Sequence, residues 1–175
     1  MKPREAILKL FGIFFLCFLV LFTTHFDLFG SSIAKFLIVS FATLKSLLFV
    51  YQNFKKIKES KMERDVYFNY LIFLGGNIIL VIISFAMDFF TLYEVNNASF
   101  QGIPSEFSLG EKVFEFFFYS ILNMTNFGFG EVIPVTLAAK TITSLEVILS
   151  FVAIIFVLSD FMSLRDSIIN RKPQK

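Results

Sequence analysis

The sequence is poor in charged residues and contains a single cysteine. Asp, Glu, Lys and Arg make up 17% of the 175 residues, whereas a soluble domain of ordinary composition is about a quarter charged. The lone Cys17 excludes a disulfide within the chain. The formal net charge of +2 is too small to indicate a nucleic-acid partner. Because 56% of the residues are hydrophobic, the composition predicts a membrane protein.

The motifs of enzymes and ATP-driven pumps are also missing from the sequence. It has one histidine, His25, and contains neither an HExxH motif nor a P-loop. A Ser–His pair and a cluster of metal-ligating residues are likewise lacking. We therefore expect no enzymatic activity, no nucleotide partner and no cofactor apart from bound ions.

What the sequence does contain is a series of long apolar runs. A helix needs about 20 mostly apolar residues to cross the hydrocarbon of a bilayer. Four runs reach that length, at residues 7–29, 32–54, 67–93 and 139–164. No small-residue cleavage site follows the first run, so we expect a retained span rather than a signal peptide. A fifth run, 113–124, is too short to span the bilayer alone and favours a re-entrant helix.

The basic residues predict how these runs are oriented. They cluster before the first run, between the second and third runs, and after the fourth. The positive-inside rule therefore places both termini and the 55–65 loop in the cytoplasm, and the 94–112 loop outside. We expect a multi-pass protein of the plasma membrane, in this case the inner membrane of a bacterium. The basic residues are Lys2, Arg4, Lys9, Lys55, Lys56, Lys58, Lys61, Arg64, Arg165, Arg171, Lys172 and Lys175.

The stretch TNFGFGE, residues 125–131, follows the short run and combines glycines with apolar bulk. Gly128 and Gly130 can adopt positive φ, so that successive carbonyl oxygens can point the same way. Such oxygens can replace the hydration shell of a cation, and the carboxyl end of a helix over 113–124 adds partial negative charge. The pattern favours an ion-conducting segment. The alternative is a small-residue packing turn, which leaves extended backbone at membrane depth unexplained.

The stretch YSILNMTNFGFGEVIP resembles the pore signature of potassium channels, T-T-V-G-Y-G-D followed by a short segment and a proline. The continuation VIPVTLAAKTITSLEVILSF is similar to small bacterial channels with a two-helix pore, and the resemblance covers about residues 112–163. In this comparison Thr125, Gly128 and Gly130 match the signature, whereas Asn126, Phe127, Phe129 and Glu131 stand for its second Thr, Val, Tyr and Asp.

The resemblance implies a passive cation channel, selective for potassium, built as a homotetramer in membrane lipid. It implies a selectivity filter at Thr125–Gly130 that holds K+ (or Na+) ions. The ions would lie at the main-chain carbonyls of Asn126, Phe127, Gly128 and Phe129. Two alternatives stay open: a weakly selective Na+/K+ channel, and an ion-binding membrane sensor or transporter subunit that does not conduct. The residues expected to support the filter or shape the pore electrostatics are Glu131, Tyr119, Asn123 and Glu146.

Several residues depart from the signature or stand out within the spans. Leu122 occupies a position where many family members carry a Glu, so we expect Glu131 to lack that partner. We expect Glu146 either to bond behind the filter, to Asn123 or Thr125, or to attract ions. We expect Tyr119 and Phe118 to hold the filter by ring packing.

Three expectations concern polar residues within the spans. Asp88 is expected at the membrane interface, and Lys45 is expected to snorkel or to pair with Asp88 or Asp160. Ser150, in place of a hinge glycine, is expected to leave the last span unbent.

The predicted fold class is an all-α membrane protein with four transmembrane helices. A re-entrant pore helix and an extended filter separate the third span from the fourth. Residues 1–66 form a two-span helical hairpin with a basic cytoplasmic loop, and its role stays open between scaffold, lipid contact and regulator. Residues 67–164 form the pore module of outer helix, pore helix, filter and inner helix. Residues 165–175 form a short cytoplasmic tail.

Overall fold

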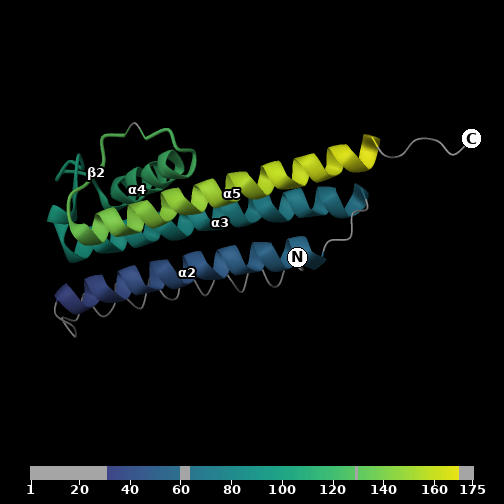
Figure 1. The fold of residues 1–175 in the computed structure, drawn as a ribbon. Helices are drawn as coiled ribbons and strands as arrows, with labels where there is room; N and C mark the ends of the chain where they lie inside the picture. Colours follow the sequence, from purple (N-terminus) through teal and green to yellow (C-terminus); the bar gives the residue numbers. More distant parts are fainter. Residues whose placement is uncertain (1–30, 60–63, 129, 170–175) are drawn as a thin grey trace, which may run out of the picture.

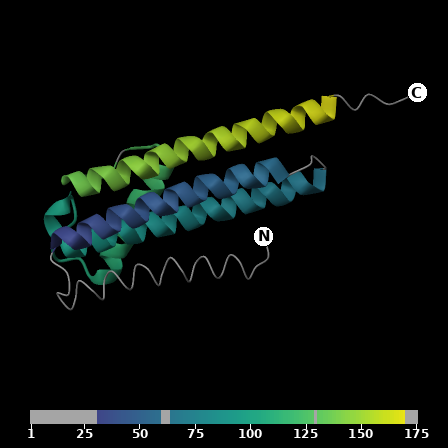
Figure 2. The ribbon, with the colours of Figure 1, turned by 60° about the horizontal axis from the view of Figure 1, so that its bottom comes forward.

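The computed structural model describes residues 31–59, 64–128 and 130–169. Three long helices, α2 (Ser31–Glu59), α3 (Arg64–Val95) and α5 (Leu137–Ile169), run alongside one another (Figures 1 and 2). The shorter helix α4 (Leu109–Met124) lies at one end of this bundle, where β1 (Phe100–Gln101) and β2 (Ile133–Pro134) pair. A short 3-10 helix, Asn97–Ser99, precedes β1. We call the end that carries both strands the β end.

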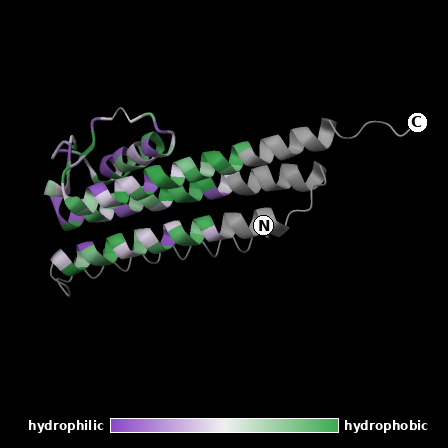
Figure 3. Ribbon diagram, viewed as in Figure 1, coloured by the Kyte–Doolittle hydropathy of each residue, from purple (hydrophilic) through white to green (hydrophobic). Residues whose placement is uncertain are grey.

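Each of the three long helices contains an apolar stretch long enough to cross a bilayer. These stretches are Ser32–Tyr51, Gly75–Val95 and Leu137–Leu158, of 20 to 22 residues, and hydrophobic residues line the described parts of all three helices (Figure 3). The structure is mostly helical and has three helices that could cross a membrane, which agrees with the predicted all-α, multi-pass membrane protein. The first predicted span, 7–29, lies outside the described residues.

The helices are longer than the spans predicted from apolar runs. α2 continues through Lys55 and Lys58, which were expected in a loop, and α5 extends five residues beyond 164 into the predicted tail. α3 begins at Arg64 rather than at 67. Bilayer thickness limits the apolar part of a helix and not the helix itself. Lys and Glu are good helix formers outside the hydrocarbon, so hydropathy finds the span but underestimates the helix.

A cluster of aromatic rings holds α4 against α3 at the β end. The Phe89 ring lies 5.0 Å from that of Tyr119 and 5.7 Å from that of Phe100, both edge-on. Phe116 lies 5.1 Å from Phe100 and 5.5 Å from Tyr93. Tilted and edge-on pairs of this kind contribute beyond the area that they bury. The cluster therefore fixes the short helix at one place along the bundle.

The β pair joins the chain before α4 to the chain after the glycine segment. Phe100 pairs with Pro134, and the Val135 amide donates to the Ser99 carbonyl at 2.9 Å. Gly102 follows β1 with φ +90°, and a Cβ at this position would lie 1.9 Å from the carbonyl oxygen of Glu131. A side chain cannot be accommodated there, so glycine permits the close approach of the two backbones.

α4 begins four residues earlier than the predicted 113–124 run, at Leu109. Ser108 precedes it, and the Glu111 amide donates to the Ser108 hydroxyl at 3.4 Å. In return the Ser108 amide donates to the Glu111 carboxylate at 2.7 Å. This reciprocal capping box satisfies amide groups that have no partner inside the helix. It explains a start site that the apolar pattern alone does not mark.

Candidate functional site

The glycine segment begins where α4 is stopped by a residue in the left-handed conformation. Asn126 has φ +56°, and its amide donates to the Asn123 carbonyl at 3.1 Å. The next amide, that of Phe127, donates to the Leu122 carbonyl at 3.0 Å. These two bonds are those of a Schellman motif, in which a residue in the left-handed region ends the helix. Asn tolerates this conformation better than other residues with a side chain.

The turn after α4 lies deep within the length of the apolar helices. The Asn126 side-chain amide donates to the Ser150 hydroxyl of α5 at 2.5 Å. At a rise of about 1.5 Å per residue, Ser150 lies roughly 20 Å along α5 from its first residue, Leu137. The chain then returns to β2 at the β end. α4 and the glycine segment thus enter and leave the bundle at the same end, as expected for a re-entrant loop.

The backbone of this turn has carbonyl oxygens that accept no backbone hydrogen bond from the described residues. In the described part of the chain, no backbone hydrogen bond ends on the carbonyls of Asn126, Phe127 or Gly128. All three residues are exposed, Phe127 to 68%. Gly128 has φ +65°, so a second residue in this short segment takes the left-handed conformation. Phe129, the fourth expected carbonyl donor, lies outside the described residues.

A buried polar layer connects α3, α4 and α5 behind the turn. Glu146 is fully buried on α5 and accepts hydrogen bonds from the Ser120 hydroxyl and, at 3.2 Å, from the Asn123 amide. The Ser120 hydroxyl also lies 2.9 Å from the Ile82 carbonyl of α3. Of the two partners expected for Glu146, Asn123 is in contact with it. The Thr125 hydroxyl donates instead to the Ile121 carbonyl, at 2.8 Å.

The other expected site residues are spread around the turn. Tyr119 is buried against Phe89 and Phe100, and its hydroxyl lies 3.1 Å from that of Thr143. Glu131 is exposed at the point where the chain passes Gly102. The structure therefore brings Asn123, Glu146 and Asn126 together and places Tyr119 and Glu131 at the edge of this group.

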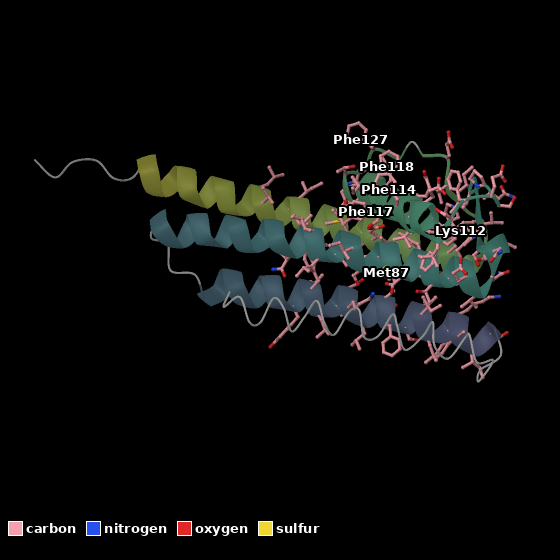
Figure 4. All side chains as sticks on the ribbon, turned by 180° about the vertical axis from the view of Figure 1, so that it is seen from behind. Met87, Lys112, Phe114, Phe117, Phe118 and Phe127 are labelled. Atoms are coloured by element: carbon pink, nitrogen blue, oxygen red, sulfur yellow. The ribbon has the colours of Figure 1, made fainter. Side chains whose placement is uncertain are left out.

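Gly130 and the aromatic face of α4 complete the surroundings of the turn. A Cβ at Gly130 would lie 3.0 Å from the Leu122 side chain, so Leu122 packs closely against this glycine. Phe114, Phe118 and Phe127 are exposed, on the side of α4 that points away from α3 (Figure 4). The expected ring packing around Phe129 stays a prediction, but Phe118 lies exposed rather than buried.

Two serines that contact the site were not identified as site residues from the sequence. Ser120 stands three residues before Asn123 on α4, and Ser150 stands four residues after Glu146 on α5. Residues three or four apart share a face of a helix. Small polar side chains at that spacing from Asn123 and Glu146, inside apolar runs, were the signal that would have found them.

An ion pair fixes α2 to α3 away from the turn. The Lys45 ammonium lies 2.5 Å from the Asp88 carboxylate and donates to the Ser84 hydroxyl at 2.7 Å. Asp88 is buried between the helices, and its expected depth at the membrane interface stays a prediction. Pairing with Asp88 was one of the alternatives for Lys45. Charged side chains inside a membrane protein are costly and pair with one another, which explains why both lie between the helices.

Comparisons with protein-family models, with curated proteins and with solved structures give no significant match to this chain. The functional interpretation rests on the sequence motif and on the geometry described above.

Proposed function

We propose that this chain is one subunit of a passive cation channel, most selective for potassium. Residues 125–130 of several copies line its ion path. The observation that carries the proposal is the exposed, non-helical turn at Thr125–Gly128, located deep within the length of the apolar helices. Irregular backbone at that depth is tolerated only where protein covers it or water fills the adjoining space.

Association of several copies follows from the same observation. In one chain Asn126, Phe127 and Gly128 are exposed residues, and no backbone hydrogen bond within the described ranges reaches their carbonyls. Each polar group left without a partner in hydrocarbon costs several kcal/mol. Copies arranged around an axis replace lipid with protein and water at these oxygens. The exposed rings of Phe114 and Phe118 supply apolar surface next to the turn for contacts between copies. The resemblance to potassium channels implies four copies.

The chemistry of conduction requires no charged side chain in the filter. Main-chain oxygens of Asn126, Phe127, Gly128 and Phe129 replace the water around K+. α4 ends at Met124, so the negative end of its dipole points toward the same place and favours a cation there. Transport is passive, because ions move between equivalent oxygen ligands down their gradient.

A specific observation favours weaker selectivity as the second candidate. The Thr125 hydroxyl bonds within α4, and the Asn126 amide donates to Ser150. These contacts direct the side chains of Thr125 and Asn126 to protein partners, so neither side chain adds an ion ligand at the inner end of the filter. A pore with fewer ligands at that point discriminates less between K+ and Na+. The third reading is an ion-binding sensor or transporter subunit that does not conduct.

We place the protein in a plasma membrane, the inner membrane of a bacterium, with both termini in the cytoplasm and the β end outside. The orientation follows from the basic residues at 55–65 and after 164. The β end carries β1, β2 and the loop before α4, so ions would enter the filter from that side.

Recording from purified protein in planar bilayers tests the proposal. Under opposed K+ and Na+ gradients, a reversal potential near the potassium value is expected, and a value near zero identifies the weakly selective pore. Absence of current from intact oligomers would overturn the channel in favour of the sensor.

A glycine substitution in the filter provides the matched test of the mechanism. Gly128→Ala places a side chain at φ +65°, which costs roughly 1–2 kcal/mol, and is expected to abolish the current. Gly110→Ala is the control, because Gly110 is helical and open space surrounds its Cβ position. Unchanged current in Gly128→Ala would contradict the filter.

A further inference from the structure

We propose that Ser150 is a positioning residue that holds Asn126 and thereby sets the ion selectivity of the filter from α5. The inference rests on the proposed channel function and names the control point of that same site. It assigns a role to a hydroxyl on the last helix that the filter motif does not include.

The contact joins the innermost turn of the loop to the middle of α5. The Asn126 side-chain nitrogen lies 2.5 Å from the Ser150 hydroxyl oxygen, and the two residues are 24 positions apart in the chain. Ser150 is 1% exposed, whereas Asn126 is exposed, so the bond joins the exposed turn to a buried hydroxyl of α5. It attaches the amide of Asn126 to α5 and leaves the main-chain oxygen of the same residue for the ion.

Ser150 is one of the helix hydroxyl residues that bond to another element rather than to their own helix, as Ser84 and Ser120 also do. A Ser or Thr inside a helix commonly bonds to the carbonyl four residues earlier. Ser46, Thr91 and Thr143 follow that pattern, with distances of 2.7 to 2.9 Å. Ser150 instead accepts a bond from another element, which indicates that its position serves the loop rather than its own helix.

The backbone of Asn126 makes this attachment consequential. Its φ of +56° lies in a region that residues with a side chain seldom adopt. The Schellman bonds fix its amide and that of Phe127, and the Ser150 bond fixes its side chain. The direction of the Asn126 carbonyl, the innermost oxygen expected to contact an ion, therefore depends on α5.

The Asn126–Ser150 bond is one of several side-chain hydrogen bonds that connect α4 and the turn after it to α5. The first to consider joins Asn123 of α4 to Glu146. The bond from Asn126, in the turn, goes to Ser150, which shares a face of α5 with Glu146. Glu146 also contacts Ser120, so that first connection has additional support. Removal of the Ser150 hydroxyl then releases Asn126 while the helices stay attached, which separates selectivity from folding.

The test uses Ser150→Ala in the full-length protein, with Ser150→Thr as the conservative variant and Ser144→Ala as the matched control. Ser144 lies on α5 and is exposed, so its replacement removes a hydroxyl without touching the loop. The K+/Na+ permeability ratio is measured from reversal potentials in bilayers. We expect Ser150→Ala to reduce the ratio about two- to tenfold, the range for loss of one hydrogen bond. The Thr variant keeps a hydroxyl and retains the ratio, as does the Ser144 control.

A second variant reports on the same bond from the other side. Asn126→Gly removes the amide yet accepts the left-handed conformation. Combined with Ser150→Ala, it is expected to change the ratio no further than either variant alone, because both remove one interaction. Additive changes, or an unchanged ratio in Ser150→Ala, would overturn the proposal. If Ser150→Ala fails to assemble, the K+/Na+ permeability ratio of Asn126→Gly is the test, and an unchanged ratio overturns the proposal.

Failure of the channel function itself gives a different signature. If the wild-type protein carries no current, the channel proposal fails, and the contact is then examined by NMR of the Asn126 side-chain amide in lipid nanodiscs. Slow hydrogen exchange that becomes fast in Ser150→Ala, but not in Ser144→Ala, supports Ser150 as the residue that positions the loop. Equal exchange in all three proteins contradicts it.

Discussion

Gly102 shows how one residue without a side chain shapes the chain near the candidate filter. A Cβ at this position would lie only 1.9 Å from the Glu131 carbonyl oxygen, and the φ of Gly102 is +90°. Gly102→Ala therefore both strains the backbone and collides with it. We expect the free energy of unfolding to fall by about 1–3 kcal/mol or more, and the thermal unfolding midpoint in detergent to fall with it.

The control for Gly102 is again Gly110→Ala, in which neither strain nor collision occurs. Alanine replaces glycine in the first part of α4, so stability is expected to stay equal or rise slightly. If Gly102→Ala unfolds at the same temperature as the wild type, the close approach of these two backbone segments is absent from the folded protein.

At the same scale, the sequence indicated the contacts of Glu146 with Asn123 and of Lys45 with Asp88 among its alternatives, but not that of Asn126 with Ser150. The pattern around Thr125, Gly128 and Glu146 was sufficient to mark the segment. Ser150 was noticed only as a substitute for a hinge glycine, and its bond to Asn126 depends on how α4 lies against α5. Contacts of this kind are set by the tertiary arrangement, which no local pattern encodes.

At the scale of the element, the start of α4 is expected to depend on pH. Hydrogen bonds from the Ser108 side chain and amide hold the pKa of Glu111 below its ordinary value. A carboxyl whose pKa is lowered by folding stabilises the folded state above its unfolded pKa, and this contribution is lost as the pH falls through the folded pKa. Because Glu111 is exposed, the effect is local fraying rather than unfolding.

Hydrogen exchange of the amides at 109–112 measures this fraying. We expect the first turn of α4 to open more often below the folded pKa of Glu111 than at neutral pH. In Glu111→Ala, this more frequent opening is expected already at neutral pH. In the Ser108→Ala variant the difference between the two pH values should be smaller. A pH-independent opening in the wild type would argue against the capping box.

The attachment of α2 to α3 gives a second prediction at this scale. Lys45→Met leaves the buried Asp88 carboxylate without its partner, and loss of one member of a buried pair costs about 3–5 kcal/mol. We expect a clear fall in the unfolding midpoint. Lys45→Met combined with Asp88→Leu removes both charges and is expected to recover most of the loss. A double variant no more stable than the single one would contradict the pairing.

Elements were predicted better by their apolar content than by their ends. The runs at 32–54, 67–93 and 139–164 correspond to α2, α3 and α5, because hydrophobic length is a property of the sequence alone. The start of α4 was missed although Ser108 and Glu111 stand at capping-box spacing. β1 and β2 were not foreseen, since strands this short carry no periodic signal.

For the whole molecule, the number of copies is the most direct prediction. Native mass spectrometry of the protein in mild detergent is expected to give a complex four times the 20.1 kDa mass of one chain. Phe118→Glu places a charge on the exposed aromatic face beside the turn and is expected to dissociate that complex. Ile33→Glu, on an exposed face of α2, is the matched control. A monomeric wild type would remove the basis for the shared ion path.

The pairing of β1 with β2 has a mechanical consequence for the proposed oligomer. Residues 102–108 form a mostly exposed rim. Two contacts attach this rim to the chain around β2: the close approach of Gly102 to Glu131 and the hydrogen bond between Ser99 and Val135. A force that displaces this rim is transmitted through the backbone to Glu131. In the proposed channel, a large molecule bound to the rim at the β end would therefore decrease or increase ion flow without entering the passage.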